Sequence, residues 1–172
     1  MLLKQHLSRQ LFILIVSYSS WLLLYNSLLI PFTFLDEWVI HILVVTSCLI
    51  LSILGLEVST NQGVFFQSIA IDDYPGVVIS HHCDALSVIA IFIIVLCVFS
   101  HQHRFLWRYI LSGSVIIQFV NVIRIVCLSL IFRFHPEWLK FNHDYTFTIL
   151  VYGVVVLIWW WRFRSLDKAQ LS

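Results

Sequence analysis

The sequence has few charged residues. Asp, Glu, Lys and Arg make up 11% of its 172 residues, whereas 60% are hydrophobic and 16% are aromatic. Soluble globular domains carry about 25% charged residues, so this shortage argues against a soluble protein. The formal net charge is only +1, which gives no reason to expect nucleic-acid binding.

The sequence also lacks paired cysteines. Its four cysteines are Cys48, Cys83, Cys97 and Cys127, and no two of them form a CxxC pair. All but Cys83 lie inside apolar runs, where cysteine behaves as a small hydrophobic residue. The pattern therefore does not predict a disulfide framework, and it singles out Cys83, which stands among polar neighbours.

Most of the sequence consists of long apolar runs. A membrane-spanning helix needs about 20 apolar residues, and we expect five such helices, the third of them short, at Leu11–Ile30, Trp38–Leu56, Ala85–Ser100, Tyr109–Phe132 and Tyr145–Trp161. No small-residue cleavage site follows the first run, so a removable signal peptide is not predicted. The expected fold class is all-α, a polytopic bundle of about five membrane segments that forms one domain over residues 1–172.

The longest connector, from Glu57 to Asp84, predicts a small β-hairpin. It contains two β-type runs on either side of an Asp-Asp-Tyr-Pro-Gly turn at 72–76, and such runs around a turn are typical of a hairpin at the membrane surface.

Basic residues predict the orientation of the last three segments. Cytoplasmic loops are enriched in Lys and Arg, so the connector "HQHRFLWR" (101–108) and the tail "WWWRFRSLDK" (159–168) should both be cytoplasmic. Cys83 and the connector 133–144 would then be extracytoplasmic. Lys4 and Arg9 favour a cytoplasmic N-terminus as well, which three full crossings would contradict. Either the chain starts outside, or one of the first two segments does not cross.

The fourth segment carries a polar stripe. Ser114, Gln118, Asn121 and Arg124 are spaced by four, three and three residues, which places them on one face of a helix. An arginine at a membrane-helix centre costs about 2.5–3.5 kcal/mol and usually faces the bundle or a wet cavity. The functional interpretation is an anion or oxyanion partner, and the structural one is a snorkelling arginine with Asn121 as interhelical contact.

The predicted outer rim gathers a thiol, a guanidinium and an imidazole. Cys83 stands in "SHHCDALSVIAI" (80–91), Arg124 ends the polar stripe, and His143 opens the fifth segment beside Asn142. A thiolate nucleophile, an imidazole acid–base group and an arginine that stabilises an oxyanion are the equipment of a cysteine acyl-transfer enzyme.

Other interpretations of these histidines stay open. A lone interfacial histidine is more often a surface residue than a catalyst. His81, His82, Cys83 and Asp84 resemble a metal-binding set, although adjacent histidines make a poor chelate on a helix. Bis-histidine haem ligation would need histidines deeper in the bundle than this sequence offers, because only His41 lies within an apolar segment.

Three stretches resemble the exosortase/archaeosortase family. They are Cys83 at the head of a membrane helix, "NVIRI" at 121–125, and "NHDYTFTILVYGVVVLIWWW" at 142–161, and the resemblance covers residues 55 to 165 or so. It implies a membrane-embedded cysteine enzyme that cleaves and transfers the C-terminal sorting region of exported proteins. It also implies Cys83 as nucleophile, Arg124 as thiolate or oxyanion stabiliser, and His143, favoured over His135, as acid–base residue.

The sequence departs from the family beside the nucleophile. The family commonly has Cys-x-Gly-Leu, where this chain has Cys83-Asp84-Ala85-Leu86. Alanine removes backbone freedom at the helix entry. Asp84 opposes a neighbouring thiolate by like-charge repulsion, which protonated His81 and His82 would offset.

These observations predict a membrane-embedded cysteine protease or transpeptidase in the cell (inner) membrane. Its catalytic residues are Cys83, Arg124 and His143, supported by Asn121, Asn142, His82 and Asp84, and it needs no metal or organic cofactor. Its partners are the bilayer and exported proteins whose C-terminal tails carry a motif, a membrane helix and a basic cluster. A thiol-redox membrane protein, a non-enzymatic assembly scaffold and a small transporter are the alternatives.

Overall fold

The computed structural model of the protein describes the backbone of residues 2–25, 27, 34–63, 66–72, 74, 76–80, 83, 85–99 and 106–170, and the side chains of these residues except 2–7, 34–36, 62 and 165–170. This part of the chain is mostly helical, as the composition predicts. The long helices are α1 (Leu2–Leu24), α2 (Phe34–Ile53), α3 (Leu86–Phe99), α4 (Leu106–Phe134) and α6 (Phe147–Gln170).

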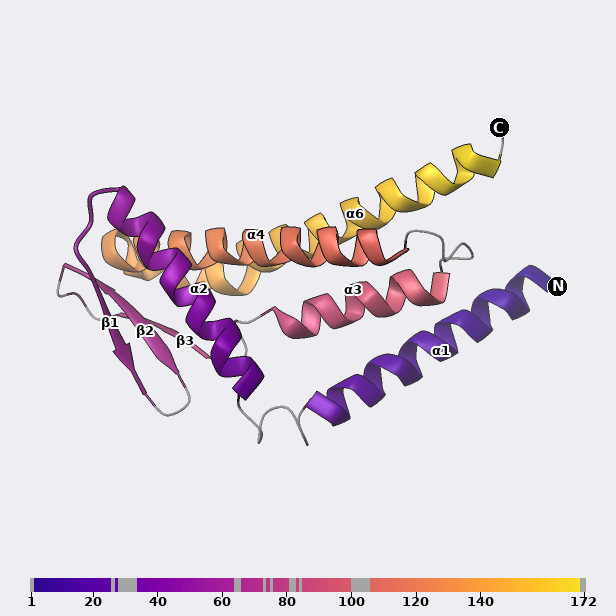
Figure 1. Cartoon of the computed structure of the whole chain (residues 1–172), viewed down its shortest axis with the longest axis horizontal. Coiled ribbons are helices and arrows are strands. Elements are labelled where there is room, and N and C mark those ends of the chain that lie inside the picture. The colour runs from indigo at the N-terminus through magenta and orange to yellow at the C-terminus, as the bar shows by residue number, and fades with distance from the viewer. Residues whose placement is uncertain are drawn as a thin grey trace.

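Four of these helices run roughly along the long axis of the molecule (Figure 1). They are α1, α3, α4 and α6, whereas α2 crosses obliquely at the end that carries a small β-sheet. The N-terminus and the C-terminus both lie at the opposite end. Because α2 stays at the sheet end, the chain returns with three more helices to the end where it began. Of the first two apolar segments, the second therefore does not run the length of the bundle.

The expectation of five full membrane segments is not supported. In the described part of the chain, two helices are long and apolar enough to cross a membrane, 106–134 and 136–164. Shorter apolar helices occupy 8–24, 37–53 and 86–99. At 1.5 Å per residue, α3 is about 21 Å long, which is less than the roughly 30 Å of a hydrocarbon core.

The predicted hairpin is confirmed and is part of a larger sheet. Strands β2 (Gln67–Ile71) and β3 (Val77–Ile79) pair antiparallel around the expected turn. Asp72 opens that turn with a φ of 51°, a left-handed conformation that Asp tolerates better than most residues. A further strand, β1 (Val58–Gln62), pairs with β2 and gives the order β1-β2-β3.

The predicted polar connector at 133–144 is helical instead. His135 separates α4 from a 3₁₀ turn, η3 (Pro136–Trp138), which continues through α5 (Leu139–Phe141) and the π-helical turn η4 (Asn142–Thr146) into α6. Proline suits the first position of a helix, because its missing N–H would have no intrahelical partner there. The helical run therefore begins at Pro136, nine residues before the predicted start at Tyr145.

Two buried clusters hold the fold together. The first, here called the sheet-end cluster, joins α2, the sheet and the second half of α4 through Ile40, Leu43, Val44, Leu51, Ile69, Ile71, Ile79, Val122, Ile125 and Val126. The second joins α3, α4 and α6 through residues that include Phe92, Leu96, Ile117 and Val155. Cys83 and Asn121 lie where these two clusters meet along α4.

Candidate active site

Cys83 lies between the sheet and α3. Its backbone N–H donates to the carbonyl of Ser80 at 2.8 Å, just after the end of β3. Its side chain is half-buried and packs against the sheet-end cluster. The thiol thus stands at the head of α3, where the sequence predicts it, on a backbone fixed by a strand on one side and a helix on the other.

A buried asparagine ties Cys83 to α4. The Nδ2 amide of Asn121 donates to the backbone carbonyl of Cys83 at 2.7 Å, across 38 residues of sequence. Asn121 is 0% exposed and Cys83 is half-buried, so this hydrogen bond is part-buried, and leaving its carbonyl unpaired would be costly. Two of the stretches that carry the family resemblance therefore touch in the folded chain.

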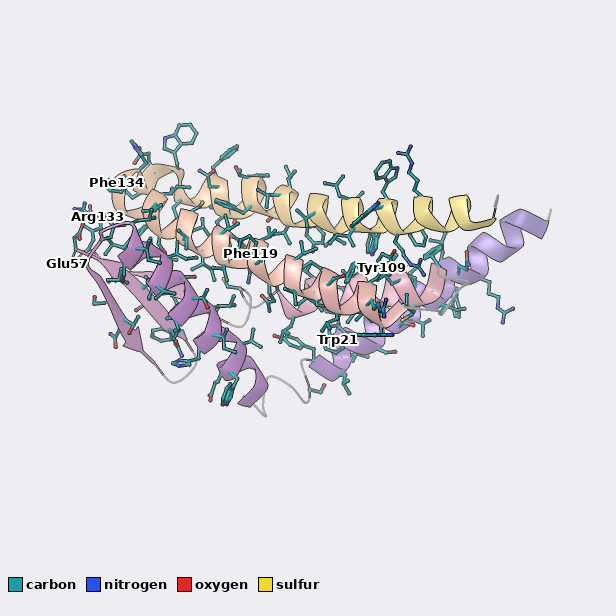
Figure 2. All side chains as sticks on the ribbon, turned by 45° about the horizontal axis from the view of Figure 1, so that its top comes forward. Trp21, Glu57, Tyr109, Phe119, Arg133 and Phe134 are labelled. Carbon is teal, nitrogen blue, oxygen red and sulfur yellow. The ribbon has the colours of Figure 1, made fainter. Side chains whose placement is uncertain are left out.

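The polar stripe on α4 faces the bundle. Asn121 is buried and Ser114, Gln118 and Arg124 are half-buried, while residues such as Phe119 on the opposite face are exposed (Figure 2). Arg124 follows Asn121 by three residues, about one helical turn. It makes no hydrogen bond or ion pair with another described residue.

His143 sits on the π-helical turn η4 and is more exposed than the other two predicted catalytic residues. Its side chain is 46% exposed, and its Nδ1–H donates to Asp144 Oδ1 at 2.9 Å. A carboxylate only accepts, so this bond leaves Nε2 as the nitrogen available for proton transfer. Asp144 was not among the predicted site residues. Its signal in the sequence was its place directly after His143.

The structure does not bring His143 into contact with Cys83 or Arg124. Counting 1.5 Å per residue from the turn at His135, His143 lies roughly 5 Å from the level of Arg124 and roughly 9 Å from that of Asn121 along the bundle. These three side chains are all described, and no hydrogen bond or ion pair joins His143 to the other two.

Asn142 supports the turn and not the thiol. Its Nδ2 donates to the carbonyl of Trp138 at 2.9 Å, and its own carbonyl accepts the N–H of Phe147, the i to i+5 bond of a π turn. Because of this i to i+5 bond, the half-buried Asn142 lies on the same side of the helix as Phe147, and His143 is its neighbour in the turn. Single π turns within helices are frequently found at functional sites.

Ala85 adopts a conformation that normally requires glycine. Its φ is 61°, in the left-handed region that costs an L-residue about 1–2 kcal/mol. The position is the one where the sequence departs from Cys-x-Gly-Leu. The backbone at the entry of α3 therefore keeps the glycine-like geometry, and the methyl group is buried at 9% exposure.

Three predicted supporting or neighbouring residues lie outside the described residues, namely His81, His82 and Asp84. The competing histidine, His135, is described and is exposed at the turn between α4 and η3, where its Nδ1 lies 3.4 Å from Glu137 Oε1. Among the described residues, no three His, Cys, Asp or Glu side chains come together as a metal site.

An arginine at the end of α4 holds the sheet against the bundle. Arg133 Nε lies 3.4 Å from Asp72 Oδ2, and its guanidinium stands 5.0 Å from the ring centre of Tyr74. Both partners belong to the turn that leads into β3. Arg133 therefore contacts the turn that precedes β3, at the end of the molecule where Figure 2 labels Arg133 and Phe134.

Comparisons with protein families, with curated proteins and with solved structures find no match to this chain.

Proposed function

We propose that this protein is a membrane-embedded cysteine peptidase or transpeptidase, similar to the exosortases, that cleaves the C-terminal sorting region of exported proteins. The observation that carries the proposal is the hydrogen bond from Asn121 Nδ2 to the Cys83 carbonyl. It joins the nucleophile segment to the segment that carries Arg124, and a buried amide at that point favours a fixed site over a chance contact.

The chemistry assigns one role to each group. The Cys83 thiolate attacks the carbonyl carbon of the substrate peptide, Arg124 stabilises the negative charge that develops, and the peptide C–N bond breaks. The leaving amine takes a proton from His143, and an acyl group remains on sulfur as a thioester. An amine, hydroxyl or water acceptor then attacks the thioester, gives its proton to His143 and releases the thiolate.

Asp144 acts as a positioning residue in this scheme. Its bond to Nδ1 orients the imidazole. The offset between His143 and Cys83 requires the η4 turn to move toward the head of α3 when substrate is bound. Catalytic hydrogen bonds are often long in free enzymes and tighten only in the complex.

Charge distribution supports a cytoplasmic position for both termini. Arg9, Arg108, Arg162 and Arg164 belong to the half of the bundle that holds the two chain ends. At the sheet end, Arg133 is paired with Asp72, and Lys140 on α5 is exposed. Lys and Arg favour the cytoplasmic side, so the sheet and Cys83 would face outward from the cell (inner) membrane. A substrate tail helix lying against the bundle would present its outer juxtamembrane peptide to Cys83.

Mass spectrometry of the C-termini of exported proteins tests this function. Wild type is compared with Cys83→Ala at equal expression, and with Cys48→Ala as a matched control, because Cys48 also packs against the sheet-end cluster. We expect one set of proteins to keep its C-terminal membrane tail only in Cys83→Ala. Loss of function in both variants would favour a thiol-redox pair. Identical C-termini in all three strains, with function retained, would refute the peptidase function and favour a non-enzymatic scaffold.

A further inference from the structure

An open surface pocket of about 410 Å³ lies between α2 and β2. We call it the α2–β2 cavity, and the described residues that line it are Glu37, Trp38 and His41 from α2 and Gln67 from β2. Glu37 and His41 are four residues apart and so share a face of the helix. Gln67 shares the core-facing side of β2 with Ile69 and Ile71, because side chains two residues apart point the same way. The cavity thus opens where the buried sheet-end cluster gives way to polar groups.

The cavity is close to the proposed nucleophile. Gln67 is paired with Ile79, Ser80 follows, and the carbonyl of Ser80 accepts the N–H of Cys83. Adding the Cα separations of a strand pair, a peptide unit and a hydrogen-bonded turn puts the Cα of Gln67 within about 16 Å of that of Cys83. An extended peptide covers this distance in about five residues.

The lining residues suit a positively charged group. Glu37 supplies a carboxylate that makes no ion pair with a described residue, and Trp38 supplies an indole that is 58% exposed. A cation is attracted both to a carboxylate and to the face of an indole ring. The Gln67 amide adds an oxygen acceptor. Among the described lining residues there is no Lys or Arg, and His41 is the one basic side chain.

We infer that the α2–β2 cavity binds a lysine or arginine side chain of the substrate peptide, within about five residues of the bond cut at Cys83. The inference rests on the proposed function for the identity of the peptide. The cavity would then select substrates by charge, separately from the bond-breaking groups on α4 and η4.

A binding measurement tests the selectivity without requiring catalysis. The full-length protein in lipid nanodiscs is titrated with two capped alanine pentapeptides that differ only in a central lysine or glutamate. We expect the lysine peptide to bind about tenfold more tightly, and Glu37→Gln to remove this difference. Glu57→Gln, an acid outside the cavity lining, should retain it. Equal affinities for the two peptides, or a difference that survives Glu37→Gln, would overturn the inference.

A charge reversal in cells separates this inference from the proposed function. In proteins whose C-terminal processing depends on Cys83, Glu37→Lys should reduce processing, and replacing the basic residue near their cut site with glutamate should restore it. Cys83-dependent processing that Glu37→Lys leaves unchanged would refute the cavity assignment alone. Peptide selectivity in the absence of any Cys83-dependent processing would leave the cation site standing and refute the proposed function.

Discussion

The Asn121 side chain donates a hydrogen bond to the Cys83 carbonyl. Removing this donor should destabilise the contact between α4 and the Cys83 segment. Asn121→Ala leaves the carbonyl without a partner, and Asn121→Asp places a carboxylate oxygen against it. We expect each change to lower the free energy of unfolding by about 1–3 kcal/mol, measured by thermal unfolding in detergent.

Ser129→Ala is the matched control for Asn121. Ser129 is also a buried polar residue of α4, but its hydroxyl donates to the Ile125 carbonyl within the same helix. Removing it leaves α4 and Cys83 connected as before. Equal losses of stability in the Ser129 and Asn121 variants would mean that the hydrogen bond to Cys83 contributes no more to the free energy of unfolding than a bond within α4.

The positive φ of Ala85 leads to a second prediction about a single residue. A left-handed alanine is strained, so Ala85→Gly should keep or raise the stability, by up to about 1 kcal/mol after the loss of one buried methyl contact. Ala85→Val should lower it by more than about 1 kcal/mol, because a β-branched side chain is least tolerant of positive φ. A higher melting temperature for valine than for glycine would contradict the observed backbone.

Individual residues were predictable to the extent that chemistry made them conspicuous. Cys83 and Arg124 are polar groups in apolar surroundings, and the inward direction of the α4 stripe follows from its spacing. The contact of Asn121 with Cys83 was not predictable, because nothing in the sequence fixes how far α3 slides along α4. The Asp144 contact depends on a π turn, which has no sequence pattern that distinguishes it from an ordinary helix.

Helices α3 and α4 approach each other closely at Gly113. A Cβ added to Gly113 would lie 2.2 Å from Cζ of Phe92, and Phe92 is fully buried and stacked on Trp159. Gly113→Ala should therefore destabilise the bundle by about 1–3 kcal/mol through overpacking. Thermal unfolding of the purified protein measures the loss.

Gly153 on α6 is the matched control, because a Cβ there meets nothing within 4 Å. Gly153→Ala should be neutral or stabilising by up to about 1 kcal/mol, since alanine is the better helix former. A similar loss of stability in both variants would show that helix propensity, and not the contact with Phe92, decides the outcome.

Elements were predictable where the hydrophobic pattern was strong. All five apolar runs contain a helix, and the strands beside the 72–76 turn are where their β-type residues indicate. Strand β1, with the sequence Val-Ser-Thr-Asn-Gln, has one apolar residue and no alternation. It forms a strand because β2 offers it a free edge, which is a tertiary cause. The helical run from Pro136 was missed because Pro136 and the charged residues Glu137 and Lys140 interrupt the apolar pattern there.

The whole molecule has both chain ends on one side of the bundle and the sheet on the other. This arrangement predicts that both termini lie on the same side of the membrane. Five crossing segments would place them on opposite sides. Hydrophobicity alone did not reveal it, because α2 is as apolar as a crossing helix and its direction depends on packing against β2 and α4.

Thiol labelling in whole cells measures this topology. In a background without the four native cysteines, single cysteines replace Ser8 on α1, Ser59 on β1 and Ser165 on α6. Only Ser59→Cys should react with a membrane-impermeant maleimide from outside, and the other two should react after permeabilisation. Labelling of Ser8→Cys and Ser165→Cys from opposite sides would contradict the arrangement of the helices.

The central claim is that Cys83 carries the acyl group of a cleaved protein. Intact-protein mass spectrometry of this protein, purified from native cells at low pH, measures it directly. We predict a fraction of the wild-type protein with an added mass on Cys83 that hydroxylamine removes, as expected for a thioester, and no such mass in Cys83→Ala. A free Cys83 thiol in all of the protein, in cells where exported proteins still lose their C-terminal tails, would contradict the account.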